Sequence, residues 1–328
     1  MTYHHLSRSE RVVLYSLRNE GHTLRFIALA LKRSASSLSR ELRRNLNHGP
    51  YDPCEANWLA TSRRRWTRPK PKRQCQSLME YVLARLRDTW SPQQIAGRLR
   101  RENASGHTTM RISHETIYRH IRQDHRHGGR LYTHLRHARR KYDKRLAPCA
   151  GRGRIKDRVS ITERPQSVEQ QLHIGDWEAD TIHGRSATGF VATLVERKTL
   201  YTLARLLYDL KANSLNNAVI HAFQRIPAAL RRTLTCDNGT EFASFKSLQA
   251  ELGCSIYFAH PYAAWERAIN ENTNGLLRQF IPKKTSFKTL TQQQLDQYVE
   301  MLNSRPRRKL DYQTPNEAFF NAVVALQS

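Results

Sequence analysis

The chain has 328 residues, enough for two or three domains with at least one sizeable core. Its 55 Lys and Arg outnumber 28 Asp and Glu, which gives a formal net charge of +27. Such an excess favours a polyanionic partner, usually nucleic acid, because each neutralised phosphate releases counterions. The excess is uneven: residues 1–150 hold 32 basic and 11 acidic side chains, and residues 151–328 hold 23 and 17. We therefore expect the first half to face phosphate and the second half to keep its carboxylates for catalysis.

Several protein classes are disfavoured by composition. The five cysteines are an odd number without a C-x-x-C pair, which argues against a disulfide framework and against a cysteine zinc site. The histidines between residues 120 and 137 match no spacing of zinc ligands. The N-terminus has no basic stretch followed by an apolar one, and no run approaches the roughly 18 apolar residues that span a bilayer. We expect a soluble, intracellular protein.

Residues 6–45 predict three helices with a tight break. Ser7 is placed to cap a first helix that ends near Asn19, before Glu20-Gly21. A short second helix follows Thr23, and a third covers residues 35–44. The expected apolar positions are Val12, Val13, Tyr15 and Leu17 in the first helix, Phe26, Ile27, Ala30 and Leu31 in the second, and Leu38 and Leu42 in the third.

The outer face of the third helix is small, polar and basic. Two short helices in close succession, the second with such a face, are typical of a helix-turn-helix that binds DNA. The alternative is an ordinary three-helix bundle with solvated charges. We assign residues 1–60 to an N-terminal DNA-binding domain. The DNA-contacting side chains that we predict here are Arg33, Ser36, Ser37, Ser39, Arg40, Arg43 and Arg44.

A basic linker and a second helical domain are expected next. Residues 61–76 include seven basic side chains and two prolines between 61 and 73, and we expect Arg63, Arg64 and Arg65 to lie on DNA backbone. Residues 77–123 form a second helix-turn-helix-like domain, in which Ser91-Pro92 and Ser113 begin helices. His114 and Arg119 are its predicted DNA contacts. Residues 124–165 are basic and poor in apolar side chains, which indicates an extended connector.

Strand patterns begin after residue 170. Three β-rich segments at hairpin spacing, 174–183, 190–196 and 201–207, precede a helix at about 215–224. A strand at 233–236, a helix near 245–252, a strand at 255–258 and a helix at about 265–280 follow. This order predicts a mixed α/β sheet flanked by helices in a domain spanning residues 166–328.

Acidic residues occur at three places in this domain. Asp176, Glu178 and Asp180 alternate along one strand and so share one face of it. Asp237 ends a strand before a turn-forming Asn-Gly. Glu271 lies on a helix, and Glu266, about 140° away around that helix, is poorly placed to share its ligand.

These carboxylates suit a hard divalent cation. Mg²⁺ binds carboxylate oxygens and keeps positions for water and phosphate, and two such ions can support an in-line phosphoryl displacement. Spacing alone makes this a weak inference, because α/β domains contain many acids, and it leaves positions 176, 178 and 180 as alternatives.

A family resemblance narrows the choice. The segments Gly175–Ile182, Asp237–Phe242, His260–Phe280, Asn303–Leu310 and Thr314–Glu317, and the helices at 36–45 and 91–100, resemble the IS-thirty family of insertion-sequence transposases. That family has an integrase-type, RNase H-like DDE domain, and 33 residues separate Asp237 from Glu271 as they do there. Lys32 and Ala179 depart from it, because glycine is common at both positions.

The resemblance implies the site. Asp180, Asp237 and Glu271 are the catalytic acids and the ligands of two Mg²⁺ ions, for which Mn²⁺ can substitute. Arg267, Arg278, Lys283 and Lys284 are expected to hold backbone phosphate near the metals. Asn238, Asn270 and Asn274 could bind the acids or simply lie in turns and on helix surfaces. Trp177 and Trp265 are expected in the core.

The implied function is a transposase, acting in the bacterial cytoplasm at the nucleoid, that binds the terminal inverted repeats of its element. It would cleave the 3′ ends and join them to target DNA. A DNA-binding regulator and a nuclease of the same fold are the alternatives. Because two ends must meet, a homodimer or higher oligomer on DNA is expected.

Overall fold

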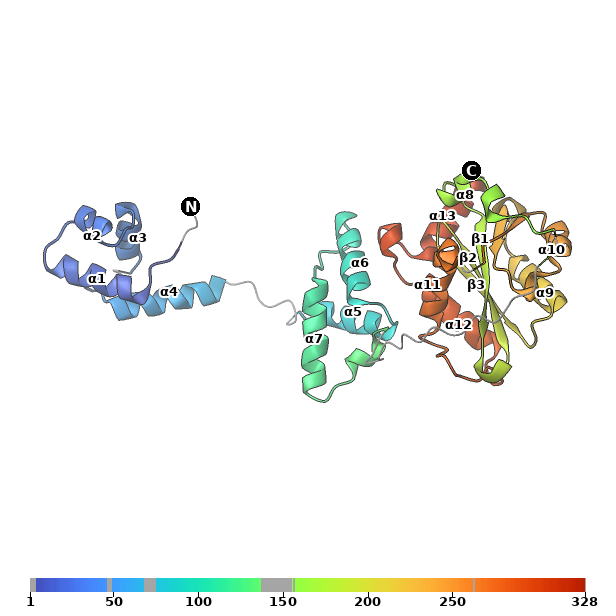
Figure 1. Cartoon of the computed structure of the whole chain (residues 1–328). Coiled ribbons are helices and arrows are strands. Elements are labelled where there is room, and N and C mark those ends of the chain that lie inside the picture. Colours follow the sequence, from blue (N-terminus) through green and yellow to red (C-terminus); the bar gives the residue numbers. More distant parts are fainter. Residues whose placement is uncertain are drawn as a thin grey trace. The chain divides into compact units, whose positions relative to one another are not determined.

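The computed structural model describes residues 4–45, 49–67, 75–136, 155, 157–261 and 263–327. The chain divides into two compact units, Met1–Gln74 and Cys75–Ser328 (Figure 1). Within the described part of the chain, no helix is long and apolar enough to cross a membrane.

The described helices of the first unit are α1 (Arg8–Asn19), α2 (Leu24–Ala30), α3 (Ala35–Asn45) and α4 (Pro53–Thr67). Ser7 caps α1 in a capping box with Glu10, and Thr23 caps α2, as their positions before the helices indicate. Leu14, Ile27 and Leu38 are fully buried and form the centre of a small core. The three helices predicted for residues 6–45 are confirmed.

The predicted inward faces of α1 and α2 are partly wrong, although Ile27 is fully buried as predicted and Leu17 and Leu31 pack against the core. Val12, Val13 and Phe26 are between 40% and 49% exposed, whereas Leu14 and Ala28 are buried. For α1 the reason is the unpredicted helix α4, which packs on it. An apolar face can be located only when all the helices that cover it are known.

The same helix corrects the predicted linker. Residues 61–67 form the last part of α4 instead of an extended arm. A start signal was present, because the Asp52 carboxylate accepts the backbone N–H groups of Cys54 and Glu55 at 3.1 and 3.0 Å, with Pro53 at the first helical position. Residues 68–74, the rest of the basic run, lie outside the described residues.

The second unit begins with α5 (Gln76–Arg87), α6 (Pro92–Ala104) and α7 (His114–Arg126). Ser91 and Gln94 form a capping box and Ser113 caps α7, as predicted. The core of this helical part is built on fully buried side chains, Val82, Leu86, Ile95 and Ile117.

The connector predicted from residue 124 is partly ordered. The helix α7 continues to Arg126, and a 3-10 turn, η2 (Leu131–His134), packs Leu131 and Tyr132 against the same core. The apolar residues of this segment are too sparse for a full helix. Leu131 and Tyr132 are nevertheless enough to anchor the turn on the core. Residues 137–154, with His137, lie outside the described part.

The sheet has five strands in the order β3-β2-β1-β4-β5: β1 (Asp176–His183), β2 (Phe190–Glu196), β3 (Thr202–Leu207), β4 (Thr233–Cys236) and β5 (Ser255–Phe258). The first three strands form antiparallel hairpins, and β4 and β5 continue the sheet in parallel to β1. The predicted mixed sheet is confirmed, in the RNase H-like arrangement that the resemblance implied.

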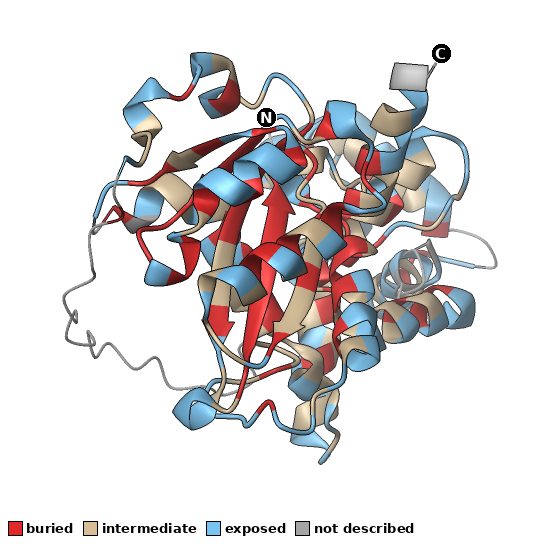
Figure 2. Cartoon of the chain, turned by 90° about the vertical axis from the view of Figure 1, so that its right-hand side faces the viewer, coloured by how far each residue is buried: buried red, intermediate tan, exposed pale blue. Residues whose placement is uncertain are grey.

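Helices cover both faces of the sheet (Figure 1). On one face α9 (Ala212–Phe223) and α10 (Phe245–Leu252) enclose a core around Trp177 and Phe223; on the other α11 (Ala268–Leu277) and α12 (Gln292–Asn303) enclose a second. Figure 2 shows the strands as mostly buried between these layers. The remaining α-helices of the unit are α8 (Gln166–Glu169) and α13 (Pro315–Gln327).

The helical part of the second unit is docked on the C-terminal segment. Arg98 of α6 bonds to the Glu317 carboxylate of α13, and Arg101 pairs with Asp311 at 3.0 Å. The aromatic ring of Tyr312 approaches Gly97 so closely that an added Cβ would lie 2.1 Å from it. One face of α6 therefore contacts protein.

Candidate active site and DNA-binding surfaces

The three acids of β1 differ in their surroundings. Asp176 is fully buried, and its Oδ1 accepts the Thr233 hydroxyl at 2.8 Å. Glu178 is also fully buried; it pairs with Arg197 and accepts the Asn270 backbone N–H at 2.9 Å. Only Asp180 reaches the partly exposed end of this face. The first two acids therefore have structural partners, and Asp180 alone is placed to meet a ligand from solvent.

Asp180 and Asp237 converge on one guanidinium. Nη1 of Arg267 lies 3.1 Å from Oδ1 of Asp180, and its Nη2 lies 3.6 Å from Oδ2 of Asp237. The chain directions explain the meeting, because β1 and β4 are parallel neighbours and both acids lie toward the C-terminal ends of these strands.

Electrostatics at this point are strong. Burial raises the pKa of Asp180 above its usual range, the neighbouring Asp237 acts in the same direction, and Arg267 opposes both. Burial alone would lower the pKa of Arg267, but the charges of Asp180 and Asp237 raise it above its usual value. The place between the two carboxylates is thus one that favours a positive charge.

Two further contacts orient the aspartates. The Asn274 side-chain amide donates to Oδ2 of Asp180 at 2.8 Å, and the Gly239 N–H donates to Oδ1 of Asp237 at 2.8 Å. Asn274 is oriented in turn by the buried hydroxyl of Thr193, 2.9 Å from its Oδ1. Sequence reasoning missed Thr193. The signal was the hairpin register, which places Thr193 directly opposite Asp180.

Glu271 is exposed on α11. It lines a surface pocket of about 380 Å³ together with Asp180, Asn274, Arg278 and Lys283. Among the described residues, no group of three His, Cys, Asp or Glu side chains is close enough to hold a metal ion. The structure thus brings Asp180 and Asp237 together around Arg267 and places Glu271 beside Asp180 in one pocket.

The predicted phosphate contacts near the site have separate environments. Arg267 is turned to the aspartates, and its side chain is only 15% exposed. Arg278 donates to the His183 carbonyl at 2.9 Å and, like the exposed Lys283, borders the pocket. Lys284 is exposed and has a left-handed backbone, with φ of 69°.

Three other residues of the acid-bearing motifs have structural roles. Glu266 accepts hydrogen bonds from the His260 ring and backbone at 2.7 and 2.8 Å, so it has a partner away from the aspartates. Glu241, not assigned a role from sequence, is buried and accepts the Thr181 hydroxyl at 3.0 Å. The Asn238 amide donates to the Ala259 carbonyl at 2.6 Å and so joins the segments that follow β4 and β5.

The two tryptophans differ in burial. Trp177 is fully buried, as predicted, and donates to the Leu230 carbonyl at 2.8 Å. Trp265 is 75% exposed, which contradicts the prediction of a core position. It lies in a 3-10 turn, η7 (Ala264–Arg267), that precedes α11, so the helical face assumed for it does not exist.

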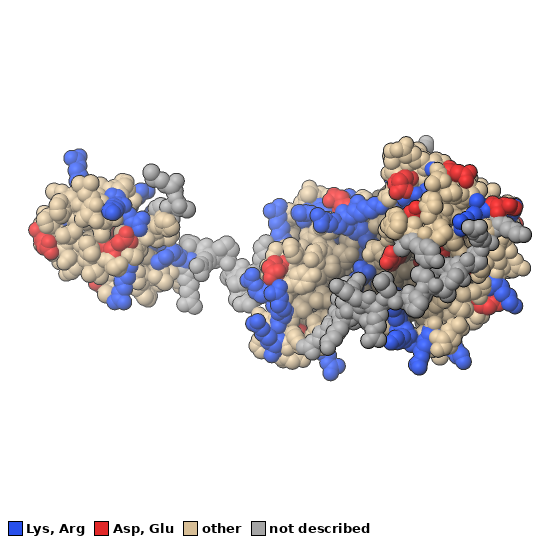
Figure 3. All heavy atoms as spheres, in the orientation of Figure 1, with Lys and Arg blue, Asp and Glu red and all other residues tan. Residues whose placement is uncertain are grey.

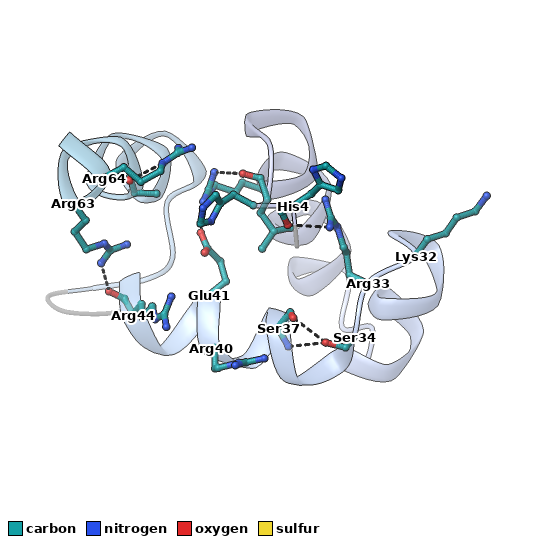
Figure 4. A pocket seen from close by; sticks show the side chains of 14 residues that line it. His4, Lys32, Arg33, Ser34, Ser37, Arg40, Glu41, Arg44, Arg63 and Arg64 are labelled. Carbon is teal, nitrogen blue, oxygen red and sulfur yellow. Dashed lines mark hydrogen bonds and ion pairs between the residues drawn. The ribbon is translucent and has the colours of Figure 1, made fainter. Parts of the chain in front are cut away.

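The first unit has a basic pocket of about 510 Å³ (Figure 4). Its wall combines the N-terminal segment, the turn before α3, α3 itself and α4, and Glu41 is the one acid among its lining residues. Arg11 pairs with Glu41 at 2.6 Å. The remaining cationic and histidine side chains of the lining are His4, His5, Lys32, Arg33, Arg40, Arg44, Arg63 and Arg64.

The predicted DNA contacts of the first unit are mostly exposed. Ser36, Ser39, Arg40, Arg43 and Arg44 are exposed on α3, and Ser37 is half-buried.

Other predicted contacts of this unit bond within it. Arg33 pairs with Glu10 at 2.9 Å, Arg63 donates to Oδ1 of Asn45 at 2.6 Å, and Arg64 donates to the Ala60 carbonyl at 3.1 Å. The side chain of Arg65 lies outside the described part.

In the second unit, His114 and Arg119 are exposed on α7. Figure 3 shows basic side chains gathered over the helical part of this unit. One face of α6 contacts the C-terminal segment, and both DNA contacts predicted for this part lie on the solvent-facing side of α7.

A helix-turn-helix unit joined to an RNase H-like domain with acids at one sheet edge has the parts of a DNA transposase. A helix-turn-helix domain family matches residues 2–45. The chain is 36% identical over 317 residues to the transposase of insertion sequence element IS4351 from Bacteroides fragilis, covering 96% of this chain and 95% of that protein.

Two further relatives agree. The transposase InsI of element IS30C from Escherichia coli K12 is 37% identical over 340 residues, covering 98% of this chain and 84% of that protein. The transposase of IS1086 from Cupriavidus metallidurans is 37% identical over 317 residues, covering 95% of this chain and 93% of that protein.

The catalytic core of bovine-immunodeficiency-virus (BIV) integrase matches 48% of this chain at 18% identity, with a TM-score of 0.38. The chain belongs to the IS30 family of insertion-sequence transposases, the IS-thirty family of the resemblance above.

Proposed function

We propose that this transposase binds the terminal inverted repeats of its own element, cleaves the 3′ ends and joins them to target DNA, working at the bacterial nucleoid. The observation that carries the proposal is the convergence of Asp180 and Asp237 on a positive charge at the edge of the sheet. Charge alone would also suit a DNA-binding regulator. Two carboxylates held together against their mutual repulsion instead suit a site built for cations.

The donor set fits a hard divalent ion. Asp180 and Asp237 offer carboxylate oxygens around a place that already accommodates the Arg267 cation, and Glu271 lines the adjoining pocket. These three side chains would hold Mg²⁺ or Mn²⁺, two ions in the proposed enzyme. When bound, such ions activate a nucleophile and stabilise the leaving oxygen of a phosphodiester.

Other residues of the chain have distinct roles at this site. Asn274 and the Gly239 N–H fix the orientation of the two aspartates. Arg278 and Lys283 border the pocket and are placed to hold a DNA phosphate beside the acids. Phosphate contacts of this kind position the strand without reading its sequence.

DNA recognition is assigned to the helical parts. We propose that α3 lies in the major groove with Ser36, Ser39 and Arg43 toward bases, while the basic pocket beside it holds backbone phosphate. His114 and Arg119 of α7 form a second contact. Because each phosphate contact adds to the salt dependence, removing Arg40 should reduce the slope of log K against log salt by about one.

The test uses a duplex ending in the element's terminal repeat, target DNA and Mg²⁺ or Mn²⁺. The wild-type protein should give joined products; Asp180→Asn, Asp237→Asn and Glu271→Gln should bind the duplex and give neither cleavage nor joining. Glu266→Gln is the matched control, because Glu266 lies in the same motif and bonds to His260 instead. Cleavage without joining would indicate a nuclease, and full activity of Asp180→Asn would indicate that the acids are not catalytic.

Assembly is part of the proposal. Joining two ends requires both to be held at once, so we propose a homodimer or higher oligomer on DNA. Light scattering of the protein with and without the repeat duplex measures this, and a monomer bound to a single end under conditions that give joined products would contradict it.

A further inference from the structure

The guanidinium of Arg267 lies where a metal ion of the proposed function would lie. It contacts Asp180 at 3.1 Å and Asp237 at 3.6 Å, and its side chain is 15% exposed. The carboxylates are separated from bulk solvent to a similar extent, with 22% and 11% of their side chains exposed. A cation of the chain thus offsets part of the charge of the two acids in the free protein.

This guanidinium is held by charge more than by hydrogen bonds. Its buried Nε makes no hydrogen bond to any residue that the structure describes, and its Nη1 contacts Asp180 as an ion pair at 3.1 Å. An arginine in a purely structural pair normally uses its planar fork to make two parallel hydrogen bonds to a carboxylate. Arg98 and Glu317 do so elsewhere in the chain, with both distances at 2.7 Å. Another cation could therefore replace the Arg267 guanidinium between the two carboxylates.

The backbone position of Arg267 would also allow its side chain to turn away from the aspartates. It ends the 3-10 turn η7 and precedes the first residue of α11, so its backbone is at the junction between two helical elements. Its φ and ψ of −124° and 35° lie outside the helical region. A small change at this junction would turn the side chain without unwinding α11.

We propose that Arg267 is an internal counter-ion that competes with divalent metal for Asp180 and Asp237. In the free protein it keeps the two acids together and lowers their affinity for metal. Metal loads when Arg267 leaves, and DNA phosphate, the anion that this protein binds, is the group that receives the guanidinium. The inference rests on the proposed function, because it assumes that these acids bind metal.

The test measures Mn²⁺ affinity of the full chain directly, by the electron paramagnetic resonance signal of free Mn²⁺. Arg267→Gln should bind Mn²⁺ at least about tenfold more tightly than wild type, because the metal no longer has to displace a guanidinium whose attraction to a carboxylate is worth about tenfold or more. Arg278→Gln is the control. It removes an equal charge from the pocket that Asp180 lines, where Arg278 donates to the His183 carbonyl, so its gain should stay below about twofold.

Thermal stability provides a second test of the role of Arg267. Without metal, Arg267→Gln removes the cation between two neighbouring carboxylates and should lower Tm. Mn²⁺ should then raise Tm more than it does in wild type. If Arg267→Gln does not fold, Arg267→Lys replaces it. A compact ammonium cannot bridge both acids as a guanidinium does, so a smaller gain in affinity is expected.

The outcomes separate the two proposals. Equal Mn²⁺ affinity in wild type and Arg267→Gln, abolished by Asp237→Asn, would overturn the role of Arg267 and leave the metal site intact. The same gain in Arg278→Gln would overturn it too, because the effect would be one of general charge. Mn²⁺ binding that is absent or insensitive to Asp237→Asn in every variant would refute the metal site itself and the inference with it.

Adding a blunt duplex oligonucleotide tests the role of phosphate. The Mn²⁺ bound by DNA is subtracted with Asp237→Asn plus duplex as the baseline. DNA should raise the Mn²⁺ affinity of wild type and change that of Arg267→Gln much less, and by linkage Mn²⁺ should tighten DNA binding by the same factor. An equal gain in both proteins would overturn the release of Arg267 by DNA.

Discussion

Arg98 on α6 donates two parallel hydrogen bonds to the carboxylate of Glu317 on α13, each 2.7 Å long. This pair joins the helical part of the second unit to the end of the RNase H-like domain. The hydrogen bonds from Arg98 hold the pKa of Glu317 below its usual range. The pair therefore stabilises the fold above the ordinary glutamate pKa, and this contribution is lost as the pH falls through the lowered one.

Disrupting the pair should loosen the docking of α6. We expect Arg98→Gln and Glu317→Gln each to lower the free energy of unfolding by about 1 kcal/mol, because Glu317 is partly solvated and screening reduces the gain. A double-mutant cycle by chemical denaturation measures the coupling. Arg122→Gln, which removes the exposed ion pair with Glu115 within α7, is the control and should have almost no effect. Additive effects of Arg98→Gln and Glu317→Gln would contradict the pairing.

Neutralising Glu178 should mainly lower stability, whereas neutralising Asp180 should mainly remove activity. Glu178→Gln leaves the buried Arg197 paired with the exposed Glu169, so the free energy of unfolding should fall by about 3 kcal/mol. Asp180→Asn leaves Arg267 paired with Asp237 and should cost less than about 1 kcal/mol while removing strand transfer. Urea denaturation and the joining assay measure the two effects. An unstable Asp180→Asn with normal stability in Glu178→Gln would reverse the assignment of structural and catalytic acids.

Lys32 occupies a turn that favours glycine. Its φ is 51°, in the left-handed region, between α2 and the cap of α3. Such a backbone costs a side-chain-bearing residue about 1–2 kcal/mol, partly offset by the entropy that glycine loses on folding. Lys32→Gly should thus stabilise the first unit by about 1 kcal/mol.

Hydrogen exchange of the α2 and α3 amides in the full chain measures this change. Lys32→Ala removes the charge and keeps the Cβ, so it should leave stability nearly unchanged. Equal stabilisation by Ala and Gly would show that charge, and not backbone conformation, limits this turn.

The first unit should lose stability in acid. Hydrogen bonds from Arg33 lower the pKa of Glu10 from 4.5 to about 2. A carboxyl with a lowered folded pKa stabilises the fold fully above its unfolded value, and the stabilisation is lost between about pH 4.5 and pH 2. Denaturation of the separately expressed unit Met1–Gln74 across this range measures the loss, and Glu10→Gln should flatten it. An unchanged pH dependence in Glu10→Gln would assign the acid sensitivity to other carboxyls.

Much of the fold follows from local sequence. Ser7, Ser91 and Ser113 cap helices at the predicted positions, because a cap depends on a side chain and on backbone N–H groups within three residues of it. The strands at 190–196, 233–236 and 255–258 have the predicted bounds for a similar reason. The alternation of side chains along a strand is a property of consecutive residues.

Packing decided what these local patterns leave open. The periodicity of α1 is compatible with more than one inward face, and α4 selected the face that contains Leu14. Trp265 became exposed because the chain enters α11 through a 3-10 turn. Neither outcome depends on neighbours in sequence alone.

The candidate site divides in the same way. The alternation of Asp176, Glu178 and Asp180, the turn after Asp237 and the helix bearing Glu271 are properties of the sequence, and the family motif selects one acid from each segment. That Asp176 and Glu178 are buried with Thr233 and Arg197, and that Arg267 lies between Asp180 and Asp237, depends on tertiary structure. Burial and charge pairing join residues from separate elements, and their energies depend on distance in space, which only the packed sheet and helices define.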